Sequence, residues 1–352
     1  MKKTALASGR SGFLDMLKMV CVIMIIITHV SWTDSARSFF AFPYLIEMAV
    51  PVFMIISAYL RANKIEKVGI KRFLSARSSL TSLGNLMVAY VIVAVIEIAA
   101  ALLISRFDLG VDFGYVESPA KLAAWFFTGL SGPGSYYMPV MVQLIVYYPL
   151  IWLLVKKGKE AGVFACFLMN LGYELLVYQC AMNPDAYRLL IFRYTFLIAL
   201  GVYLSMAAGK RKDDVVAAFF LVMGLFFVTF NAYIKPFVLF QSWKSTCMLC
   251  VPLAYGAIYY LKKYFGNISY KKVFIIGKAS LHIYLTQMIF YGFGAARFIR
   301  MLLPSSMSAL LVGVAECVVA IGVCVPAGIV FYVVESKLRK KLFGIKRPAR
   351  VA

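Results

Sequence analysis

The sequence predicts an all-α, polytopic membrane protein with about ten transmembrane helices and with both termini in the cytoplasm. Hydrophobic residues make up 62% of the 352 residues, the mean hydropathy is +0.84, and only 15% of the residues are charged. A water-soluble domain of this length cannot bury that much apolar surface, whereas lipid acts as an apolar solvent. We therefore expect residues 1–352 to form one integral membrane domain, which ends in a basic cytoplasmic tail over 337–352.

The apolar stretches predict the positions of the helices. Ten of them are long enough to cross the ~30 Å hydrocarbon core of a bilayer. The stretch Ala120–Leu130 is too short to cross, so we expect a re-entrant or interfacial segment there. The ten predicted spans are Phe13–Ser31, Pro43–Leu60, Leu80–Ser105, Tyr136–Val155, Ala161–Ala181, Leu189–Ala208, Val215–Asn231, Ser245–Leu261, Val273–Phe298 and Ser308–Val334.

The charge distribution predicts the orientation. The chain carries 37 Lys and Arg against 15 Asp and Glu, and cytoplasmic loops of membrane proteins are enriched in Lys and Arg. With the N-terminus inside, the basic runs all fall on the cytoplasmic side, and an even number of helices returns the C-terminus there. No basic and aromatic stripe lies on a soluble face, so we do not expect nucleic-acid binding. The basic runs are Lys2, Lys3 and Arg10, Arg61–Arg77, Lys156, Lys157 and Lys159, Lys210–Lys212, Lys262–Lys272 and Lys337–Arg350.

The first span carries three ionisable residues, which are costly inside a bilayer and therefore candidates for function. Lys18 and His29 are eleven positions apart, so they lie on one helix face, about 16 Å apart along the axis. Asp15 is one turn before Lys18 and could hold its ammonium group. The alternative is that Lys18 extends to the inner interface and His29 only meets the outer one.

Further polar residues fall in the other spans, and so many of them suggest a polar cavity between the helices. The second histidine, His282, is near Lys278 at the end of a span, and we expect it to be structural. Cys247 and Cys250 form a C-x-x-C pair with no second pair or histidine nearby, so no metal site is predicted. The other intramembrane polar residues are Glu47, Asn85, Glu97, Gln143, Glu174, Arg193, Gln287 and Glu316.

Five stretches, in order along almost the whole chain, share a recognisable pattern. The first is Asp15-x-x-Lys18 followed by His29, and together the five resemble the acyltransferase-3 family of integral membrane acyltransferases. The family has an Arg where this chain has Lys18, which keeps the charge but loses the bidentate fork. It has a late His where this chain has Gln287, so no second imidazole is available at that position. The other four stretches are Ala49–Leu60, Tyr136–Leu150, Phe192–Gly201 and Ser280–Gln287.

The resemblance implies transfer of an acyl group, most often acetyl from acetyl-CoA, to a hydroxyl of a cell-surface polysaccharide or a lipid-linked glycan precursor. It also implies a multi-pass protein of the bacterial cytoplasmic membrane. His29 would be the general base or a transient acyl carrier, and Glu47 would orient it. Lys18, with Asp15, would contact the donor. The remaining predicted substrate-binding residues are Arg61, Lys64, Tyr136, Gln143, Arg193, Tyr284 and Gln287.

Three alternatives stay open. Arg193 could stabilise the oxyanion or bind the acceptor, or it could only pair with Glu174 or Glu47. The whole chain could be a secondary transporter of an anionic solute, although its halves show no matching pair of Gly- or Pro-broken segments. A membrane sensor or scaffold is a third class, but the sequence shows no soluble domain to signal through. The sequence does not predict the oligomeric state.

Overall fold

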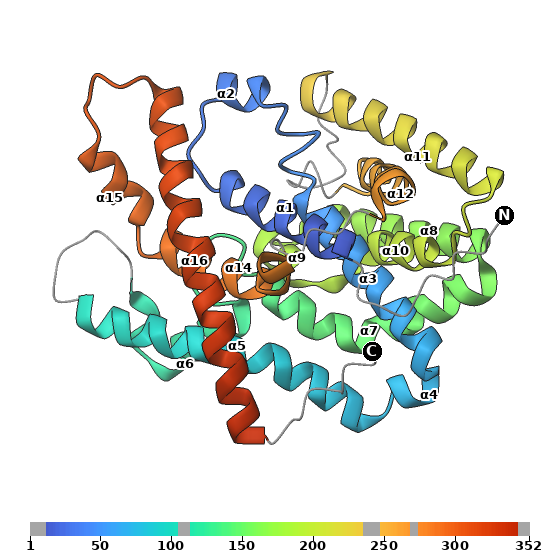
Figure 1. The fold of residues 1–352 in the computed structure, drawn as a ribbon, viewed down its shortest axis with the longest axis horizontal. Helices are drawn as coiled ribbons and strands as arrows, with labels where there is room; N and C mark the ends of the chain where they lie inside the picture. Colours follow the sequence, from blue (N-terminus) through green and yellow to red (C-terminus); the bar gives the residue numbers. More distant parts are fainter. Residues whose placement is uncertain (1–11, 105–112, 235–246, 268–273, 344–352) are drawn as a thin grey trace.

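The computed structural model describes residues 12–104, 113–234, 247–267 and 274–343 (Figure 1). Every element in these ranges is helical, and none of them is a strand, which confirms the all-α class. Within the described residues, five helices are long and apolar enough to cross a membrane. They are α5 (Ala76–Ile104), α7 (Tyr137–Gly158), α8 (Glu160–Gln179), α11 (Arg211–Thr229), which continues into the π-helical η3 (Phe230–Ile234), and α16 (Ala309–Phe343).

The other predicted spans correspond to helices that are shorter, interrupted or, in the case of α3, more highly charged, so the count of ten is not confirmed. The predicted span Val273–Phe298 is broken into three helices. Its last break follows from Gly294, whose φ of +73° is a left-handed conformation that ends a helix. The helices that correspond to these other five predicted spans are α1 (Gly12–Thr28), α3 (Ala49–Val68), η2 (Ile191–Tyr194) with α10 (Thr195–Met206), α12 (Pro252–Phe265), α13 (Phe274–Lys278), α14 (Ser280–Gly292) and α15 (Ala295–Leu302).

The predicted re-entrant or interfacial stretch is α6 (Pro119–Thr128), a short helix that lies beside α5 in Figure 1. Ser118 caps its start, because the Ser118 hydroxyl accepts a hydrogen bond from the Lys121 N–H. Gly129, with φ of +115°, ends it. The remaining short elements are α2 (Asp34–Phe39), α4 (Ile70–Phe73), η1 (Gly114–Val116) and α9 (Pro184–Leu189).

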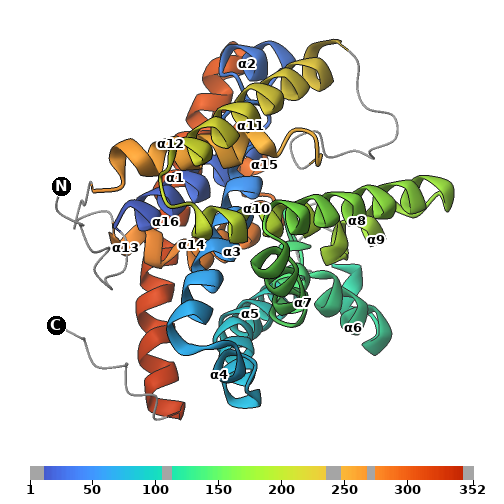
Figure 2. The ribbon, with the colours of Figure 1, turned by 90° about the vertical axis from the view of Figure 1, so that its right-hand side faces the viewer.

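The centre of the bundle is formed by α1, α3, α10 and α14. α3 packs against both α1 and α10, and the three helices lie together in the middle part of Figure 2. A glycine allows the closest approach, since a Cβ on Gly201 of α10 would lie 2.5 Å from the Ile55 carbonyl oxygen of α3. This packing places the polar residues of α1 in the interior of the protein.

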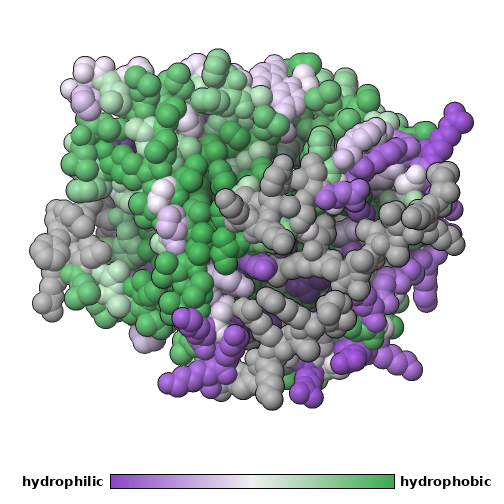
Figure 3. Space-filling model, viewed as in Figure 1, coloured by the Kyte–Doolittle hydropathy of each residue, from purple (hydrophilic) through white to green (hydrophobic). Residues whose placement is uncertain are grey.

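The surface separates apolar from basic regions. In Figure 3 hydrophobic residues cover most of the upper and left part of the visible face, and hydrophilic residues gather along its lower and right edges. Val318, Val330 and Val334 of α16 are each more than half exposed, as lipid-facing side chains are. Among the basic runs, Lys2, Lys3 and Arg10, residues 268–272 and the tail beyond Phe343 lie outside the described residues.

Candidate active-site cavity

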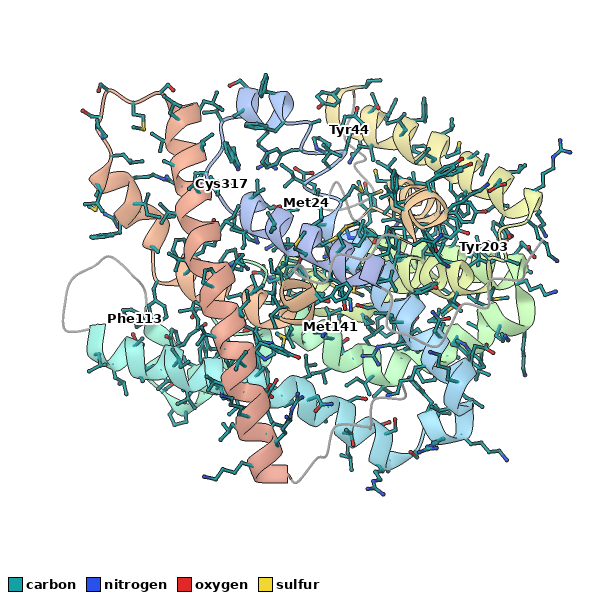
Figure 4. All side chains as sticks on the ribbon, viewed as in Figure 1. Met24, Tyr44, Phe113, Met141, Tyr203 and Cys317 are labelled. Atoms are coloured by element: carbon teal, nitrogen blue, oxygen red, sulfur yellow. The ribbon has the colours of Figure 1, made fainter. Side chains whose placement is uncertain are left out.

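One cavity of about 930 Å³ lies between the central helices. Its wall is formed by α1, α3, α5, α7, α9, α14, η3, the segment 29–47 and the loop before α7. Met141 of α7, labelled near the middle of Figure 4, is part of this wall. Five of the predicted site residues also line it, namely Lys18, His29, Glu47, Tyr136 and Tyr284.

Lys18 lines the cavity together with Ser280 and Leu281 of α14. Its Nζ is 3.7 Å from Asp15 Oδ1, so the predicted contact between these two residues is confirmed. Asp15 itself is buried, with a side chain 3% exposed, and is not part of the wall. Lys18 is therefore a cation that faces the cavity while a buried carboxylate holds it from behind.

His29 follows directly after α1 and is half-buried. The edge of its ring meets Tyr291, with 5.9 Å between the ring centres. Gly134 lines the cavity next to His29, and its carbonyl oxygen accepts a hydrogen bond from the Tyr284 hydroxyl. A Cβ built on Gly134 would lie 3.8 Å from His29 Nε2, so this ring nitrogen faces the backbone of the loop that precedes α7.

A cluster of charged residues lines the cavity beyond His29. Arg37 Nη2 donates to Glu47 Oε1 at 2.5 Å, and the Arg37 guanidinium is 5.0 Å from the centre of the Phe42 ring. Glu47 was predicted to orient His29, but the hydrogen bond that the structure gives Glu47 is with Arg37. Asp34 and Arg188 line the same cavity.

Two predicted substrate-binding amides lie behind the wall. Gln143 donates to the Leu189 carbonyl at 2.6 Å and accepts from the Ile191 N–H at 3.1 Å, so it holds the connection between α9 and η2 against α7. Gln287 is fully buried and donates to the Pro133 carbonyl at 3.3 Å. Neither lines the cavity, and the structure gives both a bracing contact with backbone.

The remaining predicted cations also lie apart from the cavity wall. Arg193 is 1% exposed, and its guanidinium lies 4.7 Å and 4.8 Å from the ring centres of Tyr187 and Tyr194. Arg61 is one turn beyond the cavity-lining Ser57 on α3. Lys64 is exposed, and its ammonium lies 5.6 Å from the centre of the Phe73 ring.

Several residues of the wall are not predicted by the sequence. Asp34, Arg37 and Arg188 lie outside the predicted spans, among other polar residues, where a charge is ordinary. One feature of the sequence could have linked Arg37 to the site, namely its closeness to Glu47. Arg37 lies between the first two predicted spans, ten residues before Glu47, which is near the start of the second span. Among the described residues, no group of three or more His, Cys, Asp or Glu could hold a metal ion.

The cavity can therefore bind an anion near Lys18 and take a proton at His29. A family model described as an acyltransferase domain (Acyl_transf_3) matches residues 11–329 of the chain. This match includes every residue that lines the cavity. The search of curated proteins found no match, and neither did the search of solved structures.

Proposed function

Because this chain belongs to the acyltransferase-3 family of membrane acyltransferases, we propose that it moves an acyl group from cytoplasmic acyl-CoA to a hydroxyl of a glycan. The acyl group is acetyl, and the acceptor is a cell-surface polysaccharide or a lipid-linked glycan precursor. His29 is the general base. The protein lies in the bacterial cytoplasmic membrane with the basic loops and both termini inside.

One observation carries the proposal: Lys18 and His29 line the same cavity. They are about 16 Å apart along the first helix at 1.5 Å per residue. A donor whose phosphates are near the Lys18 end can thus extend its thioester toward His29. The acceptor reaches His29 from the opposite end, past Arg37 and Glu47.

The reaction follows from this arrangement. The acceptor hydroxyl donates a hydrogen bond to a ring nitrogen of His29, which takes the proton as the oxygen attacks the thioester carbonyl carbon. The carbon–sulfur bond then breaks, and the CoA thiolate leaves with the proton that the imidazolium holds. Transient acylation of His29 is the second route open to the same residues, and both routes need the imidazole at this position.

The other predicted residues fall into three groups. Tyr136 and Tyr284 line the cavity and can contact the acceptor or the acyl group. Arg61 and Lys64, near the end of α3, attract the polyanionic donor toward the bundle. Gln143, Gln287 and Arg193 act on the substrates only through the backbone and aromatic rings that they brace.

Purified protein in lipid vesicles tests the proposal. With labelled acetyl-CoA, the wild type is expected to hydrolyse the thioester slowly and to acylate an added glycan acceptor, and His29→Ala is expected to do neither. Mass spectrometry of surface glycans, with and without the protein in cells, identifies the acceptor by loss of an acetyl-sized increment. Uptake of an anionic solute into the vesicles without acyl transfer would instead support the transporter.

A further inference from the structure

The loop Gly129–Ser135, between α6 and α7, has an unusual backbone. Gly129, Leu130, Gly132 and Gly134 all have positive φ, of 115°, 75°, 89° and 85°. A non-glycine residue such as Leu130 is rarely found in this conformation, which persists only where the surroundings impose it. The loop is therefore held in one shape by its neighbours.

Four side chains from three elements hold this loop. The Trp125 Nε1–H donates to Ser131 Oγ at 2.9 Å, and Glu97 Oε2 accepts from the Ser131 N–H at 3.1 Å. On the other side, Gln287 and Tyr284 of α14 donate to the carbonyls of Pro133 and Gly134. Ser131 is thus held from α5 and α6, and Pro133 and Gly134 are held from α14.

Glycine is required where the loop meets α14. A Cβ on Gly132 would lie 2.3 Å from the Met288 carbonyl oxygen, which no side chain can occupy. At Gly134 the situation differs, because a Cβ there would lie 3.2 Å from the Tyr284 hydroxyl and 3.8 Å from His29 Nε2. A methyl group would therefore fill the space directly in front of the imidazole.

Glu97 is the least expected member of this set. Its side chain is fully buried in α5, and Oε1 has no hydrogen-bond partner among the described residues. Burying a carboxyl group is costly, and Ser131 offsets this cost with hydrogen bonds from its N–H and its side chain. Its contact is with the loop rather than with the cavity, whose wall does not include it.

We propose that Glu97 is a positioning residue, which fixes the loop Gly129–Ser135 so that Gly134 leaves a space of constant width in front of His29 Nε2. A general base must be about 2.6–3.2 Å from the proton donor that it serves, so small displacements of this wall change the rate. Gln287 supports the same loop from α14, and this gives the glutamine its function here. The inference rests on the proposed role of His29.

The first test fills the space in front of the imidazole and leaves the Trp125, Glu97 and Gln287 side chains unchanged. Gly134→Ala is compared with Gly69→Ala, because Gly69 has a similar φ of +80° but nothing within 4 Å of an added Cβ. Both variants therefore place a side chain at a positive φ, and only the first shields His29. We expect Gly134→Ala to lower kcat at least about tenfold more than Gly69→Ala does.

A second readout needs no turnover. Diethyl pyrocarbonate modifies imidazole nitrogens, and mass spectrometry of the peptide that contains His29 gives the rate at that residue. Gly134→Ala should slow this modification at least about threefold, while Gly69→Ala leaves it unchanged, because only the first methyl is next to Nε2. Equal labelling and equal kcat in the two variants would overturn the proposal.

The third test separates positioning from proton transfer by Glu97. Glu97→Gln retains an acceptor for the Ser131 N–H, so kcat should stay within about threefold of the wild type, whereas Glu97→Leu should lower kcat about tenfold with little change in the donor KM. Complete loss of transfer in Glu97→Gln would contradict a positioning role, and so would full activity in Glu97→Leu. Gel filtration and thermal unfolding establish whether each variant is folded. If Gly134→Ala does not fold, the comparison of kcat between Glu97→Gln and Glu97→Leu tests the proposal.

These outcomes are separable from failure of the proposed function. If His29→Ala still transfers the acyl group, the base assignment is wrong, yet the labelling rates still report whether Gly134 forms the wall beside His29. If the base assignment holds but Gly134→Ala behaves as Gly69→Ala does, only the inference about the loop is lost.

Discussion

The two histidines of the chain lie in opposite kinds of surroundings. His29 is half-buried and lines the cavity, where its Nε2 faces the Gly134 backbone. His282, on α14, is 6% exposed and is enclosed by the rings of Phe331 and Tyr332 of α16, 4.8 Å and 5.3 Å away between ring centres. The first imidazole can reach a substrate, whereas the second can only contact protein.

His282 also belongs to a chain of polar contacts between helices. Its Nε2 is 3.5 Å from Glu335 Oε2, and Glu335 Oε1 is 3.4 Å from Arg339 Nε. Arg339 in turn donates to Asn85 of α5 at 2.7 Å. These contacts join α14, α16 and α5, which fits the structural role expected for His282. Access to the cavity, and not the residue type, therefore distinguishes the two histidines.

The largest expected effect is on His29. His29→Ala should lower the rate of acyl transfer about 100-fold to 10,000-fold, the range lost when a general base is removed. His282→Ala is the matched control and should keep the rate of the folded protein within about threefold. Steady-state transfer from labelled acetyl-CoA measures both, and equal losses in the two variants would erase the distinction drawn between them.

The sequence predicted part of this site for a clear physical reason. A charge inside an apolar span is conspicuous, so Lys18 and His29 were found, and Tyr136 and Tyr284 followed from the family resemblance. The same signal also selected Gln143, Gln287 and Arg193, because a buried polar group can bind a substrate or brace the backbone, and the pattern is the same in both cases. Only the fold shows which side of the wall such a residue occupies.

The prediction of the fold from hydropathy is also correct only in part. Hydropathy identifies apolar stretches, and the all-α class followed from them correctly. It does not register a break inside a stretch, such as the left-handed Gly294 between α14 and α15, because glycine hardly changes the average. Charged residues between the spans, such as Arg37 and Arg188, lie among other polar residues, so the sequence does not distinguish them as site residues.

The next effect concerns the donor end of the cavity. Lys18→Ala should raise the donor KM about tenfold, because it removes the cation that faces the cavity and leaves Asp15 buried without it. Lys18→Arg keeps the charge and should stay close to the wild type. Initial rates at varied acetyl-CoA concentration separate KM from kcat. A lower kcat with an unchanged KM would place Lys18 nearer the chemistry than we propose.

A smaller effect is expected on the stability that the polar contacts between α14, α16 and α5 provide. His282→Ala removes one neighbour of the buried Glu335 and should lower the free energy of unfolding by about 1–3 kcal/mol. Thermal unfolding in detergent, followed by circular dichroism, should show the midpoint falling while His29→Ala leaves it nearly unchanged. The reverse order of the two midpoints would show that His29, too, is mainly structural.

The smallest effect serves as the baseline for the others. Lys156 Nζ is 2.6 Å from Glu66 Oε1, but both side chains are more than 40% exposed. Lys156→Ala should change the stability by about 0.5 kcal/mol or less, since water and salt screen such pairs. A shift in the unfolding midpoint as large as that of His282→Ala would mean that these measurements do not resolve interior contacts from surface ones.

The length of α16 has a consequence for the lipid environment. Its 35 residues extend about 52 Å at 1.5 Å per residue, which exceeds even the ~40–45 Å of a bilayer with its headgroups. The helix must therefore tilt or project, and the choice depends on the local membrane thickness. Since α16 packs on α14, which carries Tyr284, we expect the shape of the cavity to respond to acyl-chain length in the surrounding lipid. The rate of acyl transfer should then change with bilayer thickness. A rate that stays constant when the protein is reconstituted in lipids of increasing chain length would show that this dependence is absent.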